Sequence, residues 1–317
     1  MNRAHRQLAL VLAATALLGA PGCATAGTDE PVVVVTTNIL GDVVRTVVGD
    51  EAEVRVLMQP DADPHSFEIS AQDGAMMRQA DLIVTNGLGL EEGLQQHIDS
   101  ARSGDVPVLV AGEVIDPLAY TDGDSEGAPD PHFWTDPGLM IDVVDELQGR
   151  LSDIGGVDAA SITESADAYR AELSALDSSM ATAFGRIPAE RRNLVTNHHV
   201  FGYLAERYDL RVVGAVIPGG TTLASPSASD LRGLVAAIEE AEVGTIFAES
   251  SQPDRLVQVL ADGADIDVDV VELFSESLTA PGEGADTYLA MMRTNTERIS
   301  AGLSPRDPGP QKETERQ

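Results

Sequence analysis

The chain has 317 residues, enough for two domains of ordinary size, and 43% of them are hydrophobic, which is ample for real cores. Its 20 basic residues against 52 acidic residues give a formal net charge of −32 at pH 7. This excess repels nucleic-acid phosphates, so we exclude nucleic-acid binding. Because the charges are spread along the chain, we interpret them as a solvated surface rather than as a specific metal site.

Residues 1–22 have the layout of a secretory signal peptide, with basic residues near the start and an apolar run over 8–20. That run is too short to span a bilayer core of ~30 Å at ~1.5 Å per residue. The single cysteine, Cys23, follows directly, which resembles a bacterial lipoprotein signal whose cysteine becomes the lipid-modified first residue. The alternative is an ordinary signal peptide with an incidental cysteine. We expect an exported protein, anchored to the outer face of the cytoplasmic membrane, with residues 23–30 as its tether.

Strands and helices alternate in the first half of the chain. Residues 31–37 form a continuous apolar run typical of a buried parallel strand, and Asn38 is expected to cap the following helix. Further strands are predicted over 53–58, 82–85 and 106–110, and helices over 71–79, 91–100 and, after a polar stretch over 121–129, 136–151. Such alternation implies βαβ units. We expect a first α/β lobe over residues 31–153.

Between residues 162 and 187 the apolar positions recur every three or four residues, the clearest helical pattern in the chain. They are Ile162, Ala166, Tyr169, Leu173, Leu176, Met180, Phe184 and Ile187. About 26 residues at ~1.5 Å rise make a rod of about 39 Å, long enough to run the height of a domain. We expect residues 157–187 to form a stiff linking helix that limits lobe closure to a small rotation.

Beyond this rod the alternation starts again. We predict strands over 193–197, 211–217, 245–248 and 266–273, and helices over 200–208, 227–240, 253–261 and 285–303. The expected fold is therefore of the α/β class, with two Rossmann-like lobes built on parallel sheets and joined by one long helix. The second lobe covers residues 190–303. The charged, proline-bearing tail over 304–317 is expected to be disordered.

Four of the six histidines lie in loops at the ends of predicted strands. The tripeptide Asp-Pro-His occurs at 63–65 and again at 130–132, and His198 and His199 are adjacent in the second half. Proline restricts its own backbone and that of the residue before it, so each triplet presents an imidazole from a stiff loop, as a preformed metal ligand requires. Open α/β sheets bind ligands beyond the carboxyl ends of their strands, so we expect a metal site in the cleft between the lobes.

Residue types alone leave part of this site open. Adjacent histidines in an extended segment point opposite ways, so only one of His198 and His199 can face a given site. The carboxylates near the last strands are Glu249, Glu272 and Glu276. With 52 acidic residues in the chain, composition does not choose among these three.

Several motifs together resemble those of the zinc and manganese substrate-binding proteins of bacterial ABC transporters. They are 36–42 (TTNILGD), 64–68 (PHSFE), 130–134 (DPHFW), 201–204 (FGYL) and 286–293 (DTYLAMMR). The likeness covers essentially the whole mature chain. It implies two lobes bridged by a long helix, a divalent metal between them, and delivery of this metal to an ABC permease by a monomer without enzymatic activity.

This resemblance also implies a set of ligands. The family's first two histidine ligands fall on His65 and His132, and its third ligand falls on His198. Its last ligand is an aspartate in a strand-end motif, which residues 274–278 (FSESL) match with Glu276 in that place. Glu249 is then interpreted as a carboxylate that orients a ligand imidazole from behind.

Three imidazoles and one carboxylate suit zinc, whereas manganese prefers more oxygen, so zinc is favoured. Zinc-specific relatives resemble one another in a long histidine-rich loop, but the corresponding stretch here, 121–127, is short and acidic. Because bound imidazoles must be neutral, metal affinity is expected to fall as the pH drops through ~6.5.

Two other functions compete with metal capture. A secreted zinc hydrolase is disfavoured because no H-E-x-x-H motif is present and a closed shell of four ligands leaves no position for water. A two-lobed binding protein for a chelated metal, such as a siderophore or a corrinoid, needs an aromatic or basic cleft. The aromatic content of 4% disfavours this second alternative.

Overall fold

The structure, a computed structural model, describes residues 30–121, 125–217, 219–251 and 255–305. The predicted signal peptide, Cys23 and most of the predicted tether and tail lie outside these ranges. None of the helices described within them is both long enough and apolar enough to cross a membrane.

The first lobe is built on a parallel sheet of β1 (Val32–Val35), β2 (Glu53–Val56), β3 (Leu82–Thr85) and β4 (Val108–Val110). Their order across the sheet is β2-β1-β3-β4. The helices are α1 (Asn38–Val48), α2 (Ala71–Met77), α3 (Gln95–Arg102) and α4 (Pro137–Ser152), with 3-10 turns at Glu92–Leu94, Ala111–Glu113 and Phe133–Thr135. The apolar run of β1 is almost wholly buried, as a strand covered on both faces requires.

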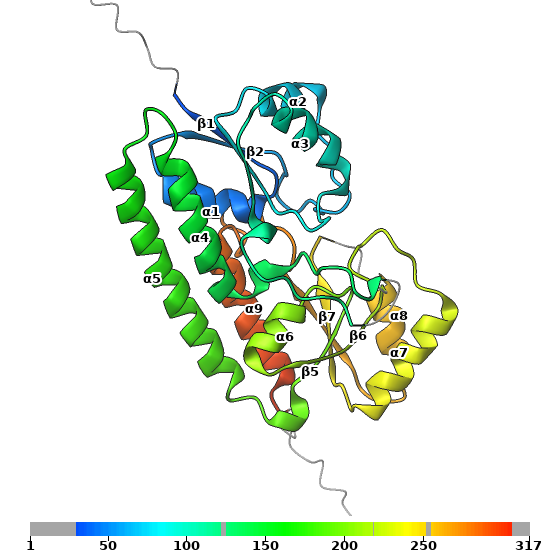
Figure 1. Cartoon of the computed structure of the whole chain (residues 1–317). Helices are drawn as coiled ribbons and strands as arrows, with labels where there is room; N and C mark the ends of the chain where they lie inside the picture. Colours follow the sequence, from blue (N-terminus) through cyan, green and yellow to red (C-terminus); the bar gives the residue numbers. More distant parts are fainter. Residues whose placement is uncertain (1–29, 122–124, 218, 252–254, 306–317) are drawn as a thin grey trace, which may run out of the picture.

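The second lobe repeats this plan. Its sheet contains β5 (Asn193–Thr196), β6 (Arg211–Ala215), β7 (Thr245–Glu249) and β8 (Asp269–Leu273) in the order β6-β5-β7-β8, all parallel. Its helices are α6 (Gly202–Tyr208), α7 (Ala228–Glu240), α8 (Arg255–Gly263) and α9 (Tyr288–Leu303), and a 3-10 turn at Ala189–Arg191 precedes β5. Two lobes with the same strand order confirm the predicted fold class (Figure 1).

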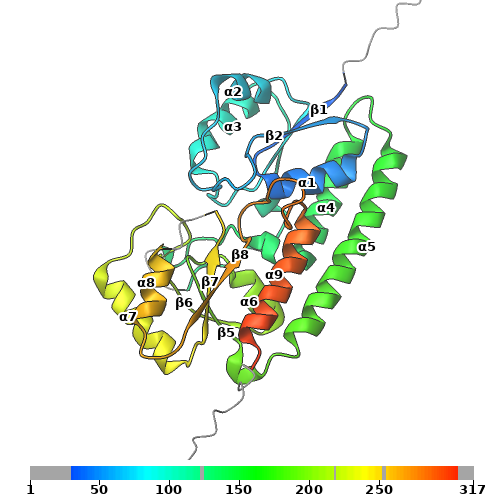
Figure 2. The ribbon, with the colours of Figure 1, turned by 180° about the vertical axis from the view of Figure 1, so that it is seen from behind.

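The long helix α5 (Ala159–Phe184) runs along one side of both lobes, as Figure 1 and the reverse view in Figure 2 show. It packs against α1 and α4 of the first lobe and against α9 of the second. Its buried residues are Ile162, Ala166, Tyr169, Leu173, Leu176, Met180 and Phe184, the apolar stripe that the sequence predicts. A single continuous helix therefore braces the two lobes.

Several boundaries differ from the sequence prediction by a few residues, and two of these differences have a clear physical cause. Thr37, not Asn38, caps α1, and its hydroxyl accepts a hydrogen bond from the amide of Leu40 at 3.4 Å. Asn38 is instead the first helical residue, and its Nδ2 donates to Ser277 Oγ of the second lobe at 2.8 Å. The predicted strand over 266–273 begins only at Asp269, because that residue pairs with Thr245, the first residue of its neighbour β7.

Candidate metal centre

Each Asp-Pro-His triplet folds into a turn that its aspartate stabilises. Asp63 Oδ1 accepts a hydrogen bond from the amide of His65 at 2.9 Å, and Asp130 Oδ1 accepts one from the amide of His132 at 3.0 Å. The intervening proline has no amide hydrogen and disfavours helical backbone before it, so the aspartate bonds the next amide along. Both histidines are therefore held on stiff loops that follow β2 and β4.

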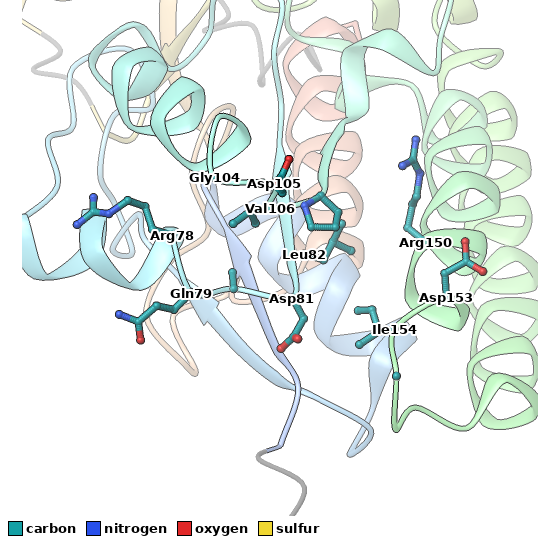
Figure 3. A pocket seen from close by; sticks show the side chains of 13 residues that line it. Arg78, Gln79, Asp81, Leu82, Gly104, Asp105, Val106, Arg150, Asp153 and Ile154 are labelled. Atoms are coloured by element: carbon teal, nitrogen blue, oxygen red, sulfur yellow. The ribbon is translucent and has the colours of Figure 1, made fainter.

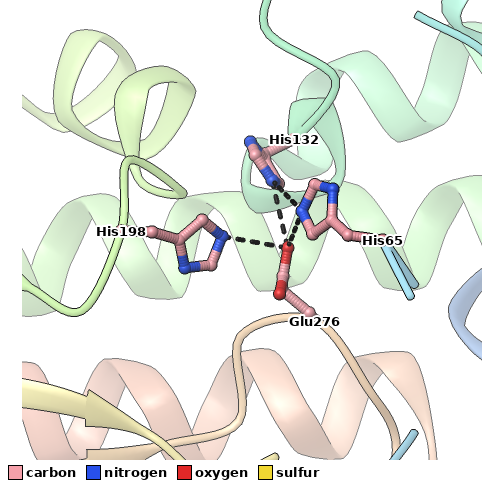
Figure 4. A group of neighbouring side chains, drawn as sticks. All are labelled: His65, His132, His198 and Glu276. Carbon is pink, nitrogen blue, oxygen red and sulfur yellow. Dashed lines mark hydrogen bonds and ion pairs between the residues drawn. The ribbon is translucent and has the colours of Figure 1, made fainter. Parts of the chain in front are cut away.

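Four side chains from both lobes converge at one point: His65, His132, His198 and Glu276 (Figure 4). The Nε2 atoms of the three histidines lie 2.9, 3.1 and 3.0 Å from Glu276 Oε1. The four candidate ligand atoms all lie within 4.8 Å of one another, and each of these residues is at most 3% exposed. Three nitrogens and one carboxylate form a donor set that suits a divalent transition metal.

The carboxyl group of Glu276 is an anion in this cluster. Burial opposes its ionisation, but the imidazoles of His198, His132 and His65 outweigh that effect and hold its pKa well below the usual range. Its other oxygen, Oε2, is buried without a hydrogen-bond partner among the residues that the structure describes. An unpartnered buried carboxylate oxygen is costly, and a cation bound by both oxygens of Glu276 would satisfy it.

His132 is tied to a carboxylate on its outer side. Its Nδ1 lies 2.7 Å from Asp130 Oδ1, and the Tyr120 hydroxyl donates to the same oxygen at 3.2 Å. Burial lowers the pKa of His132, but Asp130 and Glu276 outweigh burial and raise this pKa to about 9. With Nδ1 engaged by Asp130, Nε2 faces the other candidate ligands. Sequence reasoning misses Asp130 and Tyr120, although the aspartate repeated before each histidine is a signal for the former.

Glu249, at the end of β7, lies behind His198. Its Oε2 is 3.4 Å from His198 Nδ1, which is long for a hydrogen bond, and Ser251 Oγ donates to its Oε1 at 2.7 Å. Burial and the nearby Glu276 carboxylate raise the pKa of Glu249 well above its usual value. This placement is compatible with a carboxyl group that orients the His198 ring, a role that stays a prediction.

The structure separates the candidates that residue types leave open. His199 is outside the cluster, and its ring centroid lies 6.4 Å from that of Tyr120. Glu272 lies on β8 with its side chain 59% exposed, where its carboxylate is 3.5 Å from Arg298. Of the adjacent histidines and the carboxylates near the last strands, His198 and Glu276 are the two that join His65 and His132.

The loop that carries Glu276 is held by residues of the first lobe. Trp134 Nε1 donates to the carbonyl oxygen of Ser275 at 2.8 Å, and Asn38 Oδ1 accepts from the amide of Leu278 at 3.0 Å. These bonds hold the chain just before Glu276 and just after it. The fourth candidate ligand thus belongs to the second lobe but is positioned against the histidines by the first.

A separate cavity of about 590 Å³ lies near the start of β3, at the end of the first lobe's strands that is opposite to the candidate metal site (Figure 3). Its charged lining has both signs: Arg78, Asp81, Asp105, Arg150 and Asp153. Figure 3 shows the two arginines on opposite sides of it. None of the sequence-predicted ligands lines this cavity, so its volume does not mark the metal site.

Known proteins resemble this chain along most of its length. Residues 33–302 match the family described as "Zinc-uptake complex component A periplasmic". The chain is 32% identical to the zinc-binding protein TroA of Treponema pallidum (strain Nichols), over 95% of this chain and 99% of TroA. It is 29% identical to the metal ABC transporter substrate-binding lipoprotein ScbA of Streptococcus cristatus and 28% identical to the manganese ABC transporter substrate-binding lipoprotein ScaA of Streptococcus gordonii. Each of these two matches covers 93% of this chain and 98% of the relative.

The solved structure of the periplasmic zinc-binding protein TroA from Treponema pallidum has the same fold. Its TM-score is 0.80 at 31% sequence identity, and the match covers 87% of this chain and 100% of the other. The family consists of transport proteins, which removes the secreted zinc hydrolase from consideration. From its sequence and its fold, the chain belongs to the family of substrate-binding proteins of bacterial metal ABC transporters, and it is not an enzyme.

Proposed function

We propose that this protein captures a divalent transition metal outside the cytoplasm, zinc in preference to manganese, and delivers it to an ABC permease. Its ligands in this proposal are His65, His132, His198 and Glu276. The observation that carries it is the convergence of three imidazole nitrogens within 2.9 to 3.1 Å of one carboxylate oxygen in a buried site.

The spacing of the donor atoms supports zinc. In a tetrahedral zinc site with bonds of ~2.0 to 2.1 Å, neighbouring donor atoms lie ~3.3 Å apart. The three imidazole nitrogens lie 2.9 to 3.1 Å from Glu276 Oε1, the nitrogens of His65 and His132 lie 3.4 Å apart, and all four donor atoms lie within 4.8 Å of one another. Small movements of the side chains would therefore bring the four donor atoms to the spacing of a tetrahedral shell.

The choice between zinc and manganese depends on the balance of nitrogen and oxygen donors. Three imidazoles make nitrogen the majority, which favours zinc over a metal that prefers oxygen ligands. Glu276 Oε2, which has no hydrogen-bond partner within the described part of the chain, offers a further oxygen that manganese would use. TroA is named for zinc and ScaA for manganese, so the relatives support a divalent metal of either kind.

The burial of the ligands opposes the alternative of a chelated metal such as a siderophore or a corrinoid. The four ligand atoms lie within 4.8 Å of one another, which suits a bare ion and not a metal wrapped in an organic molecule. Each ligand residue is at most 3% exposed.

Export and anchoring complete the proposal. Residues 1–22 are the signal peptide, Cys23 carries the lipid anchor, and the protein acts as a monomer at the outer face of the membrane. The signal-like layout of the sequence and the names of ScbA and ScaA, both lipoproteins of metal ABC transporters, support this location.

Competitive titration tests the ligands and the metal together. Residues 24–317, stripped of metal, are titrated with zinc and with manganese against a chelator, alongside Glu276→Ala and the exposed control Glu272→Ala. We expect tight zinc, much weaker manganese, and a loss of about 2 kcal/mol or more of zinc binding in Glu276→Ala alone. Manganese binding as tight as zinc would overturn the metal preference. Unchanged zinc affinity in Glu276→Ala would place the fourth ligand elsewhere.

A further inference from the structure

One segment of the second lobe, residues 219–222, contacts three of the four loops that carry the proposed ligands. It lies between β6 and α7, and we call it the clasp. We propose that the clasp holds the cleft closed over the metal and limits how fast the metal leaves, without contributing a ligand. This inference rests on the metal capture proposed above and names residues that control its release.

The clasp begins beside the third ligand. The amide of His199, which follows His198, donates to the carbonyl oxygen of Gly219 at 3.4 Å. Gly219 is buried and has a φ of +95°, a backbone conformation that favours glycine. The chain therefore turns at Gly219, away from the loop that carries His198 and toward the first lobe.

The next residue packs against the partners of His132. A Cβ atom built on Gly220 would lie 2.0 Å from the Tyr120 hydroxyl and 2.2 Å from its Cζ, so only a glycine allows this approach. The Tyr120 hydroxyl in turn donates to Asp130 Oδ1 and lies 3.3 Å from His132 Nδ1. The Gly220 amide also reaches Ser125 Oγ of the first lobe at 3.5 Å.

The clasp ends on the loop of the first ligand. Thr222 Oγ1 donates a hydrogen bond to Asp63 Oδ2 at 2.6 Å in a partly buried position. The other oxygen of Asp63 accepts the amide of His65 and shapes the turn that presents this histidine. Hydrogen bonds to a carboxylate are among the stronger ones, so this contact is the main link that the clasp makes across the cleft.

These contacts cross the same gap as the metal ligands. His65 and His132 belong to the first lobe, while His198 and Glu276 belong to the second, so the ion leaves when the lobes part. Figures 1 and 2 place the loop before α7 on the side of the molecule away from α5. The long helix therefore braces the lobes on one side, and the clasp joins them on the other. Contacts that exist only in the closed state slow dissociation more than they change association.

The dissociation rate of zinc tests the clasp. Zinc-loaded protein is mixed with excess chelator, and release is followed for the wild type, Thr222→Val, Thr222→Ser and Thr221→Val. Thr221 is a matched control, because its hydroxyl accepts a local bond from the amide of Leu223 at 3.2 Å and none of the bonds found among the described residues joins it to the first lobe. We expect about tenfold faster release in Thr222→Val, as for the loss of a hydrogen bond to a charged group, and wild-type release in the other two variants.

Gly220→Ala probes the second contact independently. The added methyl group pushes Tyr120 away, so we expect faster zinc release without any change in a ligand. Wild-type release rates in both Thr222→Val and Gly220→Ala overturn the proposal. Release that is as fast in Thr221→Val as in Thr222→Val also overturns it, because a general effect on the loop would then explain both.

Amide hydrogen exchange of the metal-free protein separates this inference from the proposed function. We expect the amides of residues 219–223 to exchange faster in Thr222→Val than in the wild type or Thr221→Val. A wild-type protein that binds no zinc refutes the proposed function, and the exchange data still decide whether the clasp closes the cleft. Unchanged exchange in Thr222→Val would then show that the clasp does not join the lobes.

Discussion

The pKa of His132 predicts how metal affinity depends on pH. Burial lowers this pKa, but the carboxylates of Asp130 and Glu276 outweigh burial and raise it to about 9. The metal-free protein therefore carries a proton on His132 at pH 7. A bound metal needs the lone pair of Nε2, so this proton must leave when the metal binds. Lowering the pH restores the proton and weakens binding, and this weakening begins near pH 9 rather than near the unperturbed value of ~6.5.

The magnitude follows from the size of the shift. Between pH 9 and pH 7 the proton on His132 weakens binding about tenfold per pH unit, which is roughly a hundredfold in Kd, or on the order of 3 kcal/mol in total. Asp130→Asn keeps the shape of the side chain and removes the charge that raises the pKa. We expect the variant to have a lower His132 pKa and therefore a smaller pH dependence over this range.

Titration calorimetry measures the displaced proton directly. Zinc is titrated into metal-free protein at pH 7.5 in buffers that differ in ionisation enthalpy, and the slope of the heat against that enthalpy counts the protons released. We expect about one proton from His132 in the wild type and in the exposed control Glu272→Gln, and fewer in Asp130→Asn. Equal proton release in wild type and Asp130→Asn, or zinc affinity that is flat from pH 9 to pH 7, would refute the reasoning.

Three further predictions concern the scaffold and the metal-free site. Small-angle scattering with and without zinc is expected to show little change in radius of gyration, because α5 braces both lobes, and a large decrease would contradict a small rotation. Leu173→Ala in α5 is expected to lower the free energy of unfolding in urea by about 2 to 5 kcal/mol, because Leu173 is buried. The control Ser174→Ala, at an exposed position, is expected to lower it by at most about 0.5 kcal/mol, and equal losses would argue against the buried stripe. Because folding lowers the pKa of Glu276, its ionised carboxylate stabilises the metal-free protein at pH values above ~4.3, the pKa of this group in the unfolded chain. This stability is lost as the pH falls through the pKa of the folded state. Thermal melts at decreasing pH should show this loss in the wild type but not in Glu276→Gln, and identical profiles would exclude it.

Local patterns in the sequence were sufficient for the scaffold. The stripe from Ile162 to Phe184 predicts the buried face of α5 because helical periodicity depends only on neighbours three and four residues apart. The alternation of strands and helices predicts two parallel sheets for a similar reason. The Asp-Pro-His triplets indicate His65 and His132 because proline and aspartate shape the turn within three residues.

Local patterns fail where two candidates are equivalent until the chain has folded. Thr37 and Asn38 are both good helix caps, and the bonds from Asn38 to the second lobe show why Thr37 caps α1. Nothing close in sequence distinguishes His198 from His199. The family resemblance pointed to His198, and the physical difference between the two appears when β5 and its loop are placed beside the first lobe.

By itself, the sequence determined the two-lobed α/β plan, the long helix and the stiff loops that present two histidines. These features depend on backbone chemistry and periodicity over a few residues. The family resemblance already pointed to Glu276, but only the tertiary structure showed this residue, 211 residues from His65, beside three imidazoles. Only the tertiary structure showed that Asp130 and Glu276 raise the pKa of His132 and that Thr222 reaches Asp63. The physical reason is that hydrogen bonds and electrostatic interactions act over a few ångströms in space, whatever the separation along the chain.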